Sequence, residues 1–462
     1  MSLCVKIHPG QLPKFWDRSA IFVANLQSLF FGNQGGRQAL QSQIKGVQSY
    51  GGRLVPIIDL LLGGRENVLL VESAPDPHLL DYLTDELGMT LPTLEIMPLQ
   101  TSQIRRLDAD DAFLQRLRGH RAEWMDGFVT DGVLLELAGK AGKRVISQPD
   151  GSRRGNNKLM LHQHLLECGF PTFETELAKS KEQVATSASK LSARGYRRIV
   201  AKAQIGASGV GMLVLEAAQA GDSSVPDYFF HEGACLMQGW LEDGVGGAAI
   251  LGSPSVQIFV DEDTVSLFDI TEQILSAESV HNGNHAPVPY LSRRAGLEDT
   301  LLDQASAAGR WLHAQGYRGT ASADFLLVTK NTFHSGSARV GSGGSHDRVE
   351  VIMCELNARV TGATYPAVLA RHFMPGGAWL MRNLRFKPPL SSNALLSALR
   401  EDCSLWLPGN EKGVLPINFN LNRDGGVDKG QFLCLARKAE DCSELLGRIE
   451  RQLPLKWHYD RD

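Results

Sequence analysis

A lysine followed by three glycines is the first feature of this sequence that could do chemistry. Residues 200–212 read VAKAQIGASGVGM, in which Lys202 lies in a strand-like run. The glycines that follow are Gly206, Gly209 and Gly211. Glycine permits positive φ and lets backbone N–H groups approach an anion, while a lysine neutralises part of a phosphate charge. Because the spacing differs from that of a P-loop and also occurs in plain hairpins, the stretch alone leaves both a phosphate loop and an ordinary turn open.

A second group of polar residues could bind a metal ion. Residues 351–359 read VIMCELNAR, and alternation along a strand would put Glu355, Asn357 and Arg359 on one face. A carboxylate and an amide oxygen suit Mg²⁺, and an arginine could hold a phosphoryl group or a carboxylate. The alternative for this segment is the solvent-facing side of an edge strand.

A third acidic residue lies in a neighbouring predicted strand. Residues 320–328 read TASADFLLV, with Asp324 as the one charged residue. The Gly- and Ser-rich connection at 330–348 is expected to be a flexible loop that makes an antiparallel hairpin. If the register allows, Asp324 would lie near Glu355 and Asn357, and the three would bind one or two metal ions. Carboxylates this close would repel each other unless a cation lay between them.

The composition is that of an ordinary globular protein with several packed units. The chain has 462 residues, 43% of them hydrophobic, and a formal net charge of −4. This charge gives no electrostatic reason to expect nucleic acid or an acidic membrane as partner. No apolar run is long enough for a transmembrane helix. The seven cysteines contain no CxxC pair, which favours free thiols and a cytoplasmic location.

The elements expected around these residues begin with a parallel α/β unit. Apolar runs at 21–33, 53–62 and 66–73 are predicted as strands, and a helix is expected over 37–51. The Gly- and Asn-rich segment 145–157 is predicted to be a domain joint.

Further elements are expected toward the C-terminus. A helix is predicted from residue 158 to Gly169, a strand at 413–421 and a helix at 439–453. The segment 281–290, HNGNHAPVPY, is expected to be a loop, either solvated or lining a substrate pocket. Glu272 and Gln273, in a predicted strand, would face either substrate or solvent.

The order of these features along the chain resembles the ATP-grasp superfamily over about residues 150–385. In order they are Lys158, Lys202 with its glycine loop, the apolar stretch CLMQGWLE, Asp324, and Glu355-x-Asn357-x-Arg359. The preceding α/β unit is similar to the pre-ATP-grasp domain of that superfamily. The phrases SPSVQIFV and TGATYPAVLARHF resemble its pheganomycin-type peptide ligase branch.

The resemblance implies an α/β and α+β fold in four parts. These are a Rossmann-like pre-ATP-grasp domain at 1–149, a first ATP-grasp lobe at 150–236, a second lobe with the metal site at 237–388, and a small C-terminal α+β subdomain at 389–462.

The resemblance also implies a role for each motif residue. Asp324, Glu355 and Asn357 would bind Mg²⁺, for which Mn²⁺ could substitute. Lys202 and Arg359 would be catalytic, with Arg359 stabilising the transferred phosphoryl group or holding a substrate carboxylate. The predicted ATP-binding residues are Lys158, Lys202, Gly206, Ala207, Ser208, Gly209, Val210, Gly211, Gln238, Gly239, Trp240, Leu241 and Glu242, with Asp243 as an alternative to Glu242 for the ribose.

The implied function is an ATP-dependent carboxylate–amine ligase of small-molecule or peptide natural-product biosynthesis. Its substrates would be a small carboxylate and an amine, such as amino acids or peptides, joined through an acyl phosphate with release of ADP and phosphate. Neither nucleic acid nor membrane is an expected partner, and a homodimer is an expected assembly. The alternatives are an ATP-binding regulatory or scaffold protein without turnover, and a kinase-like relative that stops after phosphorylating its substrate.

Overall fold

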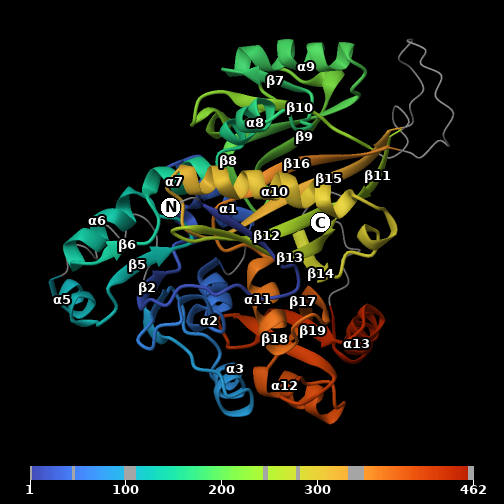
Figure 1. Ribbon diagram of the computed structural model, residues 1–462. Helices are drawn as coiled ribbons and strands as arrows, with labels where there is room; N and C mark the ends of the chain where they lie inside the picture. Colours follow the sequence, from blue (N-terminus) through green and yellow to red (C-terminus); the bar gives the residue numbers. More distant parts are fainter. Residues whose placement is uncertain are drawn as a thin grey trace.

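The computed structural model describes residues 3–43, 47–97, 111–242, 248–276, 281–330 and 348–455. Within these ranges the strands form three sheets, of five, four and ten strands (Figure 1). No helix in the described ranges is both long and apolar enough to cross a bilayer. The connection at 331–347, predicted to be a flexible loop, lies outside the described residues.

The five-stranded sheet belongs to the N-terminal α/β unit and is parallel throughout. Its order is β4-β3-β2-β5-β6. Strands β2 and β3 are buried along their whole length, which explains why they read as continuous apolar runs. The elements of this unit are β2 (Ala20–Val23), η1 (Leu26–Phe30), α1 (Gln34–Gln43), η2 (Val47–Leu54), α2 (Ile58–Leu62), β3 (Val68–Val71), α3 (Pro77–Asp81), η3 (Tyr82–Glu86), β4 (Thr93–Ile96), α5 (Asp111–Gly119), β5 (Trp124–Gly127), α6 (Gly132–Ala141) and β6 (Arg144–Val145).

Two predicted strands of this unit were wrong, one in its length and one in its kind. The strand predicted over 21–33 ends at Val23, and Leu26–Phe30 form η1. The run 53–62 is no strand: it contains the end of η2, a turn and the short helix α2. Pro56 has no N–H to give to a sheet ladder, and an apolar run of this length is also compatible with a buried helix. The segment 145–157 contains the helix α7 (Pro149–Gly155), with Pro149 in its first turn, where the missing N–H is tolerated. Its role as a domain joint stays a prediction.

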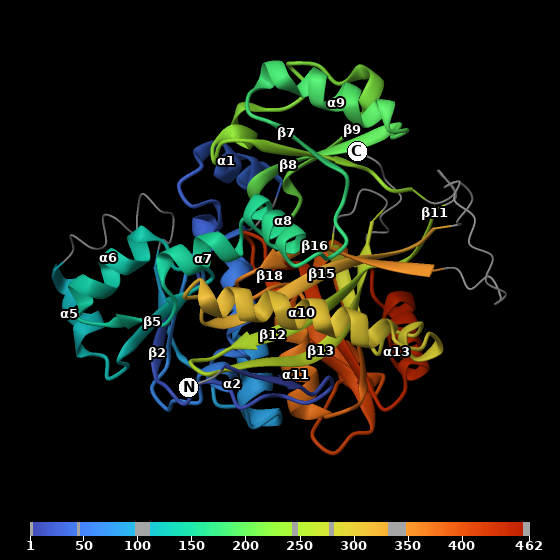
Figure 2. The ribbon, with the colours of Figure 1, turned by 45° about the horizontal axis from the view of Figure 1, so that its top comes forward.

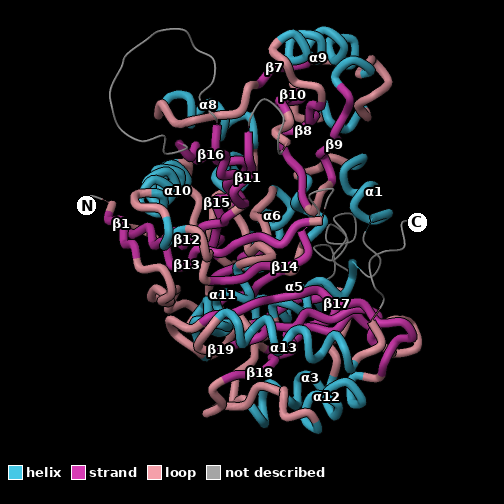
Figure 3. Tube along the Cα trace, turned by 90° about the vertical axis from the view of Figure 1, so that its right-hand side faces the viewer, coloured by secondary structure: helices cyan, strands magenta, loops and turns pink. Residues whose placement is uncertain are grey.

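The four-stranded sheet is antiparallel, in the order β7-β10-β8-β9, and makes the small upper layer in Figure 1. The N-terminal unit touches it: α1 lies beside β9 in Figure 3, and Asn33 Nδ2 donates to the Tyr228 carbonyl at 2.8 Å. Its elements are β7 (Thr175–Ala178), η4 (Lys181–Gln183), α9 (Val184–Ala193), β8 (Arg198–Ala207), β9 (Val210–Glu216), η5 (Ala217–Gln219), η6 (Asp227–Phe230) and β10 (Cys235–Gly239). Helix α8 (Lys158–Glu167) precedes β7 and buries Leu161 and Leu165 in the core of the ten-stranded sheet.

The ten-stranded sheet forms the centre of the molecule. Its path is β11-β15-β12-β13-β14-β17-β19-β18, with β16 paired to β15 and β1 paired to β13. Helix α10 lies across β12 and β13 (Figure 2), and α13 packs on β17, β18 and β19. Its elements are β1 (Cys4–Ile7), β11 (Ala248–Gly252), β12 (Pro254–Val260), β13 (Thr264–Leu275), β14 (His281–Ala286), η8 (Leu291–Arg293), α10 (Leu297–Ala314), β15 (Gly319–Lys330), β16 (Arg348–Asn357), α11 (Thr364–Phe373), β17 (Ala378–Leu390), α12 (Ser392–Glu401), β18 (Lys412–Leu421), β19 (Val427–Ala436) and α13 (Ala439–Gln452).

This sheet draws strands from several predicted domains. Strand β1 comes from the segment 1–149, and β18 and β19 come from the segment 389–462. The predicted loop at 281–290 is another correction, because β14 pairs with β13 and β17 on its two sides. Ladder partners on both edges outweigh the poor strand propensity of its Gly and Asn residues. The four domain boundaries themselves stay predictions.

Candidate functional site

One large cavity collects almost all of the predicted site residues. It has a volume of about 1650 Å³ and is lined by parts of the four-stranded sheet, the ten-stranded sheet and the N-terminal unit. The predicted residues that line it are Lys158, Lys202, residues 206–211, residues 238–241, Asp324, Glu355, Asn357 and Arg359. Among the predicted residues in the described ranges, only Glu242 does not line it. Asp243 lies outside the described residues.

The glycine segment is the turn of the β8–β9 hairpin. Ala207 pairs with Val210, and the two residues between them have positive φ, 54° at Ser208 and 83° at Gly209, as a tight I′ hairpin turn requires. A side chain at Gly206 would place its Cβ 2.3 Å from the carbonyl oxygen of Val210. The stretch is therefore a hairpin turn whose residues also line the cavity, and its phosphate contacts stay a prediction.

Lys202 lies in the middle of β8, which continues to Ala207, and it lines the cavity. Its ammonium lies 5.2 Å from the centre of the Phe173 ring, close enough for a cation–π contact. Burial lowers the pKa of Lys202, Cys354 and Glu355 oppose that shift, and Lys158 adds to it. The lysine is thus a partly desolvated cation that faces the acidic residues of β16.

The register of β15 and β16 brings the acidic residues together as predicted. Asp324 lies opposite Glu355, and Ser322 lies opposite Asn357. Between the pairs Asp324–Glu355 and Phe325–Met353, Cys354 is an extra residue on β16 and makes a β-bulge. The bulge allows consecutive residues, Cys354 and Glu355, both to line the cavity, which strict alternation would not permit.

Asp324 is held by two neutral donors. The Ser255 hydroxyl donates to Asp324 Oδ1 at 2.6 Å, and Asn357 Nδ2 donates to Asp324 Oδ2 at 3.0 Å. Burial, together with the charge of Glu355, raises the pKa of Asp324 to about 7. Two carboxylates at one point of the sheet therefore disfavour each other's charge.

Glu355 and Asn357 complete a set of oxygen donors. Glu355 Oε1 lies 2.8 Å from Lys158 Nζ, and although burial opposes its charge, Lys158 and Arg359 hold the pKa of Glu355 below its ordinary value. Asn357 Oδ1 is buried and accepts no hydrogen bond within the described structure. A buried acceptor without a hydrogen bond destabilises the folded protein, because its lost hydration is not replaced. Two carboxylates and this amide oxygen are the donors that a hard divalent cation prefers, so the residues fit Mg²⁺.

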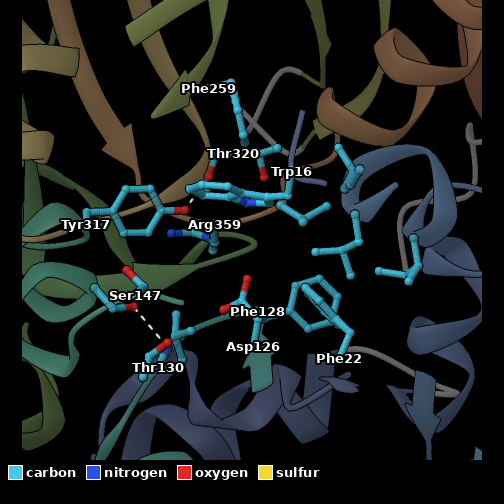
Figure 4. Close-up of a pocket in the computed structure, with 18 residues that line it drawn as sticks. Trp16, Phe22, Asp126, Phe128, Thr130, Ser147, Phe259, Tyr317, Thr320 and Arg359 are labelled. Atoms are coloured by element: carbon cyan, nitrogen blue, oxygen red, sulfur yellow. Dashed lines mark hydrogen bonds between the residues drawn. The ribbon is translucent and has the colours of Figure 1, made fainter. Parts of the chain in front are cut away.

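Arg359 lies beyond the end of β16, at Asn357, and so is not part of the strand face that alternation predicted. Its Nη1 donates to Asn156 Oδ1. It lines the large cavity and also a small one of about 30 Å³, which Tyr317 and Asp126 line as well (Figure 4). Burial lowers the pKa of Arg359, while Glu355 and Asp324 favour its charge. Burial raises the pKa of Asp126 to about 7.

The predicted adenine hinge is part of β10 and the residues after it. Gln238 Nε2 donates to Thr175 Oγ1 at 3.0 Å, and the Gly239 and Trp240 N–H groups donate to the carbonyls of Glu174 and Arg198.

Glu242, the predicted ribose ligand, is already engaged. It forms ion pairs with Arg198 and, at 3.4 Å, with Arg197. The nucleotide contacts of the hinge stay predictions.

The sequence interpretation missed a basic group at another wall of the same cavity. Arg53, Arg385 and Lys429 line it, from η2, β17 and β19. These residues are far apart in the sequence and belong to no recognisable motif. Glu272 also lines the cavity and accepts hydrogen bonds from the Tyr290 hydroxyl and, at 2.8 Å, from the Ser253 N–H.

Comparison with known proteins bears on the fold more than on the chemistry. No family model matches the chain. The butirosin acyl-carrier protein–L-glutamate ligase of Niallia circulans is 25% identical over 244 residues, which make up 52% of this chain and 51% of that protein. The chain thus matches about half the length of this curated relative. The narrower likeness to the pheganomycin-type branch stays a prediction.

Solved structures are similar over nearly their whole length. Biotin carboxylase of Campylobacter jejuni, in a β,γ-ATP complex, has a TM-score of 0.59 and 12% identity and covers 95% of this chain and 92% of its own. N5-carboxyaminoimidazole ribonucleotide synthetase of Thermus thermophilus has a TM-score of 0.55 and 12% identity, covering 96% and 100%. N5-carboxyaminoimidazole synthetase of Staphylococcus aureus with ADP has a TM-score of 0.54 and 11% identity, covering 96% and 99%. The predicted fold class is confirmed, and the chain has the two-lobed fold of the ATP-grasp superfamily.

Proposed function

We propose that this chain is an ATP-dependent carboxylate–amine ligase that forms an amide bond through an acyl phosphate. The observation that carries the proposal is the donor set of Asp324, Glu355 and Asn357, whose buried amide oxygen has no partner in the described structure. This set lines the same cavity as Lys202 and the glycine turn. The fold and the curated ligase relative support the same class of reaction.

The reaction would begin with attack of a substrate carboxylate oxygen on the γ-phosphorus of ATP, which expels ADP. The amine would then attack the carbonyl carbon of the acyl phosphate, release phosphate and lose a proton. A Mg²⁺ ion, held by Asp324, Glu355 and Asn357, would supply neutralisation of phosphate charge. No side-chain nucleophile is required, because positioning and charge neutralisation account for most of such catalysis.

The site residues would neutralise charge on the phosphates or hold the substrates in position. Lys202 would neutralise phosphate charge from the first lobe, and the N–H groups of residues 206–211 would donate to phosphate oxygens. Arg359, fixed by its hydrogen bond to Asn156, would face the transferred phosphoryl group or the substrate carboxylate. Lys158 would contact the nucleotide from beside Glu355.

The substrates would be a small carboxylic acid and an amine, at least one of them an amino acid. The curated relative is named as a ligase of an acyl-carrier protein and L-glutamate, which supports an amino acid as one substrate. A role in natural-product biosynthesis, a cytoplasmic location and a homodimer belong to the same proposal.

The test is ADP release measured with ATP, Mg²⁺ and pairs of carboxylates and amino acids, alongside mass-spectrometric detection of the amide. The proposal predicts ADP release that requires both substrates and one amide per ADP. Glu355→Gln should reduce this rate at least a hundredfold, whereas Glu411→Gln, which changes an exposed carboxylate, should not.

Other outcomes would identify the alternatives. ADP release with a carboxylate alone, without amide, would indicate a kinase-like enzyme and overturn the ligase proposal. ATP binding without ADP release for any pair would indicate a regulatory or scaffold protein.

A further inference from the structure

Three cationic side chains meet at one wall of the large cavity, and none of them forms an ion pair with an acidic side chain of the described residues. Arg385 on β17 lies directly opposite Lys429 on β19. Like charges at directly opposed positions of a sheet are unfavourable. Arg53, from the N-terminal unit, lies close enough that its charge lowers the pKa of Lys429, as the charge of Arg385 also does. Helical segment η2, which carries Arg53, packs on β18 beside this pair.

Arg53 is the most enclosed member of the group. Only 5% of the residue is exposed, and its guanidinium stacks 3.5 Å from the centre of the Tyr50 ring. Nη1 donates to the Tyr365 hydroxyl at 3.3 Å, but Nε and Nη2 have no hydrogen-bond partner in the described structure. Buried donors of a charged group are rarely left unsatisfied, because the loss of hydration is not compensated. Within the described residues, the site therefore lacks an acceptor for these two donors.

No carboxylate of the described residues fills that role. Arg53, Arg385 and Lys429 form no ion pair with an acidic side chain in the described ranges, and the charged neighbours that shift the pKa of Lys429 are both arginines. Asp428 also lines the cavity, but it is exposed and is not among the groups that shift the pKa of Lys429. His281 on β14 faces the same group, and burial together with Arg53 and Lys429 keeps its pKa low. The described residues thus supply no negative charge to this group, and an anionic ligand would provide one.

The basic group is connected to the proposed reaction site. Tyr365, the acceptor of the Arg53 hydrogen bond, lies in the first turn of α11, shortly after Arg359 and Gly362, which also line the cavity. A Cβ atom at Gly362 would lie 2.9 Å from the His281 ring. A small molecule in the cavity could therefore contact the basic group with one end and the residues around Asp324 with the other.

We propose that Arg53, Arg385 and Lys429 form a subsite that binds an oxyanion, a carboxylate or a phosphate group, on a part of the substrate that does not react. Arginine pairs with either group through two parallel N–H donors, and Lys429 adds a point charge. That the bound anion is part of a substrate rests on the proposed function, whereas the binding of an oxyanion does not. It predicts a ligase that selects substrates with a second negative charge.

The test is calorimetric titration of the full-length protein, without ATP, with L-glutamate and separately with inorganic phosphate. The proposal predicts saturable binding of at least one probe and a loss of affinity of about tenfold or more in Arg385→Met and in Lys429→Met. Arg437→Met, which removes an exposed arginine charge elsewhere, is the matched control and should bind like the parent. Arg53→Met is secondary, because a buried residue could be needed for folding.

The two probes and one further variant separate the sources of binding. Glutamate binding alone identifies a carboxylate subsite, and phosphate binding alone a phosphate subsite. Lys202→Met tests whether phosphate binds at the glycine turn. The loss of affinity caused by Arg385→Met and by Lys429→Met should be the same with and without this change. The inference is overturned if neither probe binds, or if all variants bind them equally. Loss of binding in the two variants with no amide formation for any pair would retain the subsite and reject the ligase.

Discussion

Lys158 Nζ lies 2.8 Å from Glu355 Oε1, so that a lysine predicted to contact a nucleotide and a carboxylate predicted to bind a metal ion form one ion pair. The pair joins β16 to α8, whose Leu161 and Leu165 lie in the core of the ten-stranded sheet. It therefore ties the position of α8 to the charge at the site. Changing either residue should affect both stability and turnover.

Lys158→Met should lower the free energy of unfolding by about 1–3 kcal/mol, because it leaves Glu355 partly buried without its cation. It should also reduce ATP turnover at least tenfold. Thermal unfolding and ADP release measure the two effects. Lys412→Met, which removes a lysine from the exposed pair with Asp441, is the control and should leave the melting temperature nearly unchanged. Equal effects of the two variants would contradict a special role of the Lys158 pair.

Asp324→Asn should raise the stability of the protein while it abolishes activity. Burial and the neighbouring charge of Glu355 oppose ionisation of Asp324, so its neutral amide analogue should raise the melting temperature at pH 8 by a few degrees. The same change should abolish turnover, since it removes an oxygen charge from the proposed metal set. A destabilised protein, or one that keeps its activity, would show that this carboxylate has been assigned wrongly.

Gly206→Ala should distort the β8–β9 hairpin, because its Cβ would lie 2.3 Å from a backbone oxygen that cannot move aside freely. We expect the KM for ATP to rise about tenfold and the free energy of unfolding to fall by about 1–3 kcal/mol. Gly221→Ala is matched to it, since a Cβ there would meet nothing within 4 Å. Unchanged ATP kinetics in Gly206→Ala would remove the glycine turn from the nucleotide site.

Glutamate affinity should fall as the pH rises from 6 to 8. Burial, Arg53 and Arg385 lower the pKa of Lys429 to about 7, so the lysine is protonated at pH 6 and mostly neutral at pH 8. The carboxylates of glutamate stay ionised throughout, so the change reports the protein. Calorimetry should show a decrease of about tenfold, and Lys429→Met should remove most of it. His281, facing the same group, already has a lowered pKa and should contribute little in this window.

The sequence predicted the site best where neighbouring strands carry its residues. Asp324 and Glu355 each stand in a strongly apolar strand, and the hairpin pairing that was expected places them opposite each other. The bulge at Cys354 was not foreseeable, because an extra residue in one strand leaves no mark in the apolar pattern.

Elements whose state depends on their neighbours were predicted less well. The apolar run 53–62 could be a strand or a buried helix by its own pattern, and only its packing decides. Strand β14 forms because β13 and β17 supply partners on both sides. The basic group of Arg53, Arg385 and Lys429 exists only once the N-terminal unit has packed on the strands of the C-terminal part. No local pattern could have indicated it.

The most direct test of the central claim follows an oxygen atom. A carboxylate substrate found in the ADP-release assay is labelled with ¹⁸O in both carboxyl oxygens, and the released phosphate is analysed by mass spectrometry. An acyl phosphate predicts one ¹⁸O atom in each phosphate, since the oxygen that attacks the γ-phosphorus leaves with it when the amine displaces phosphate. Unlabelled phosphate, formed together with the amide, would contradict the account.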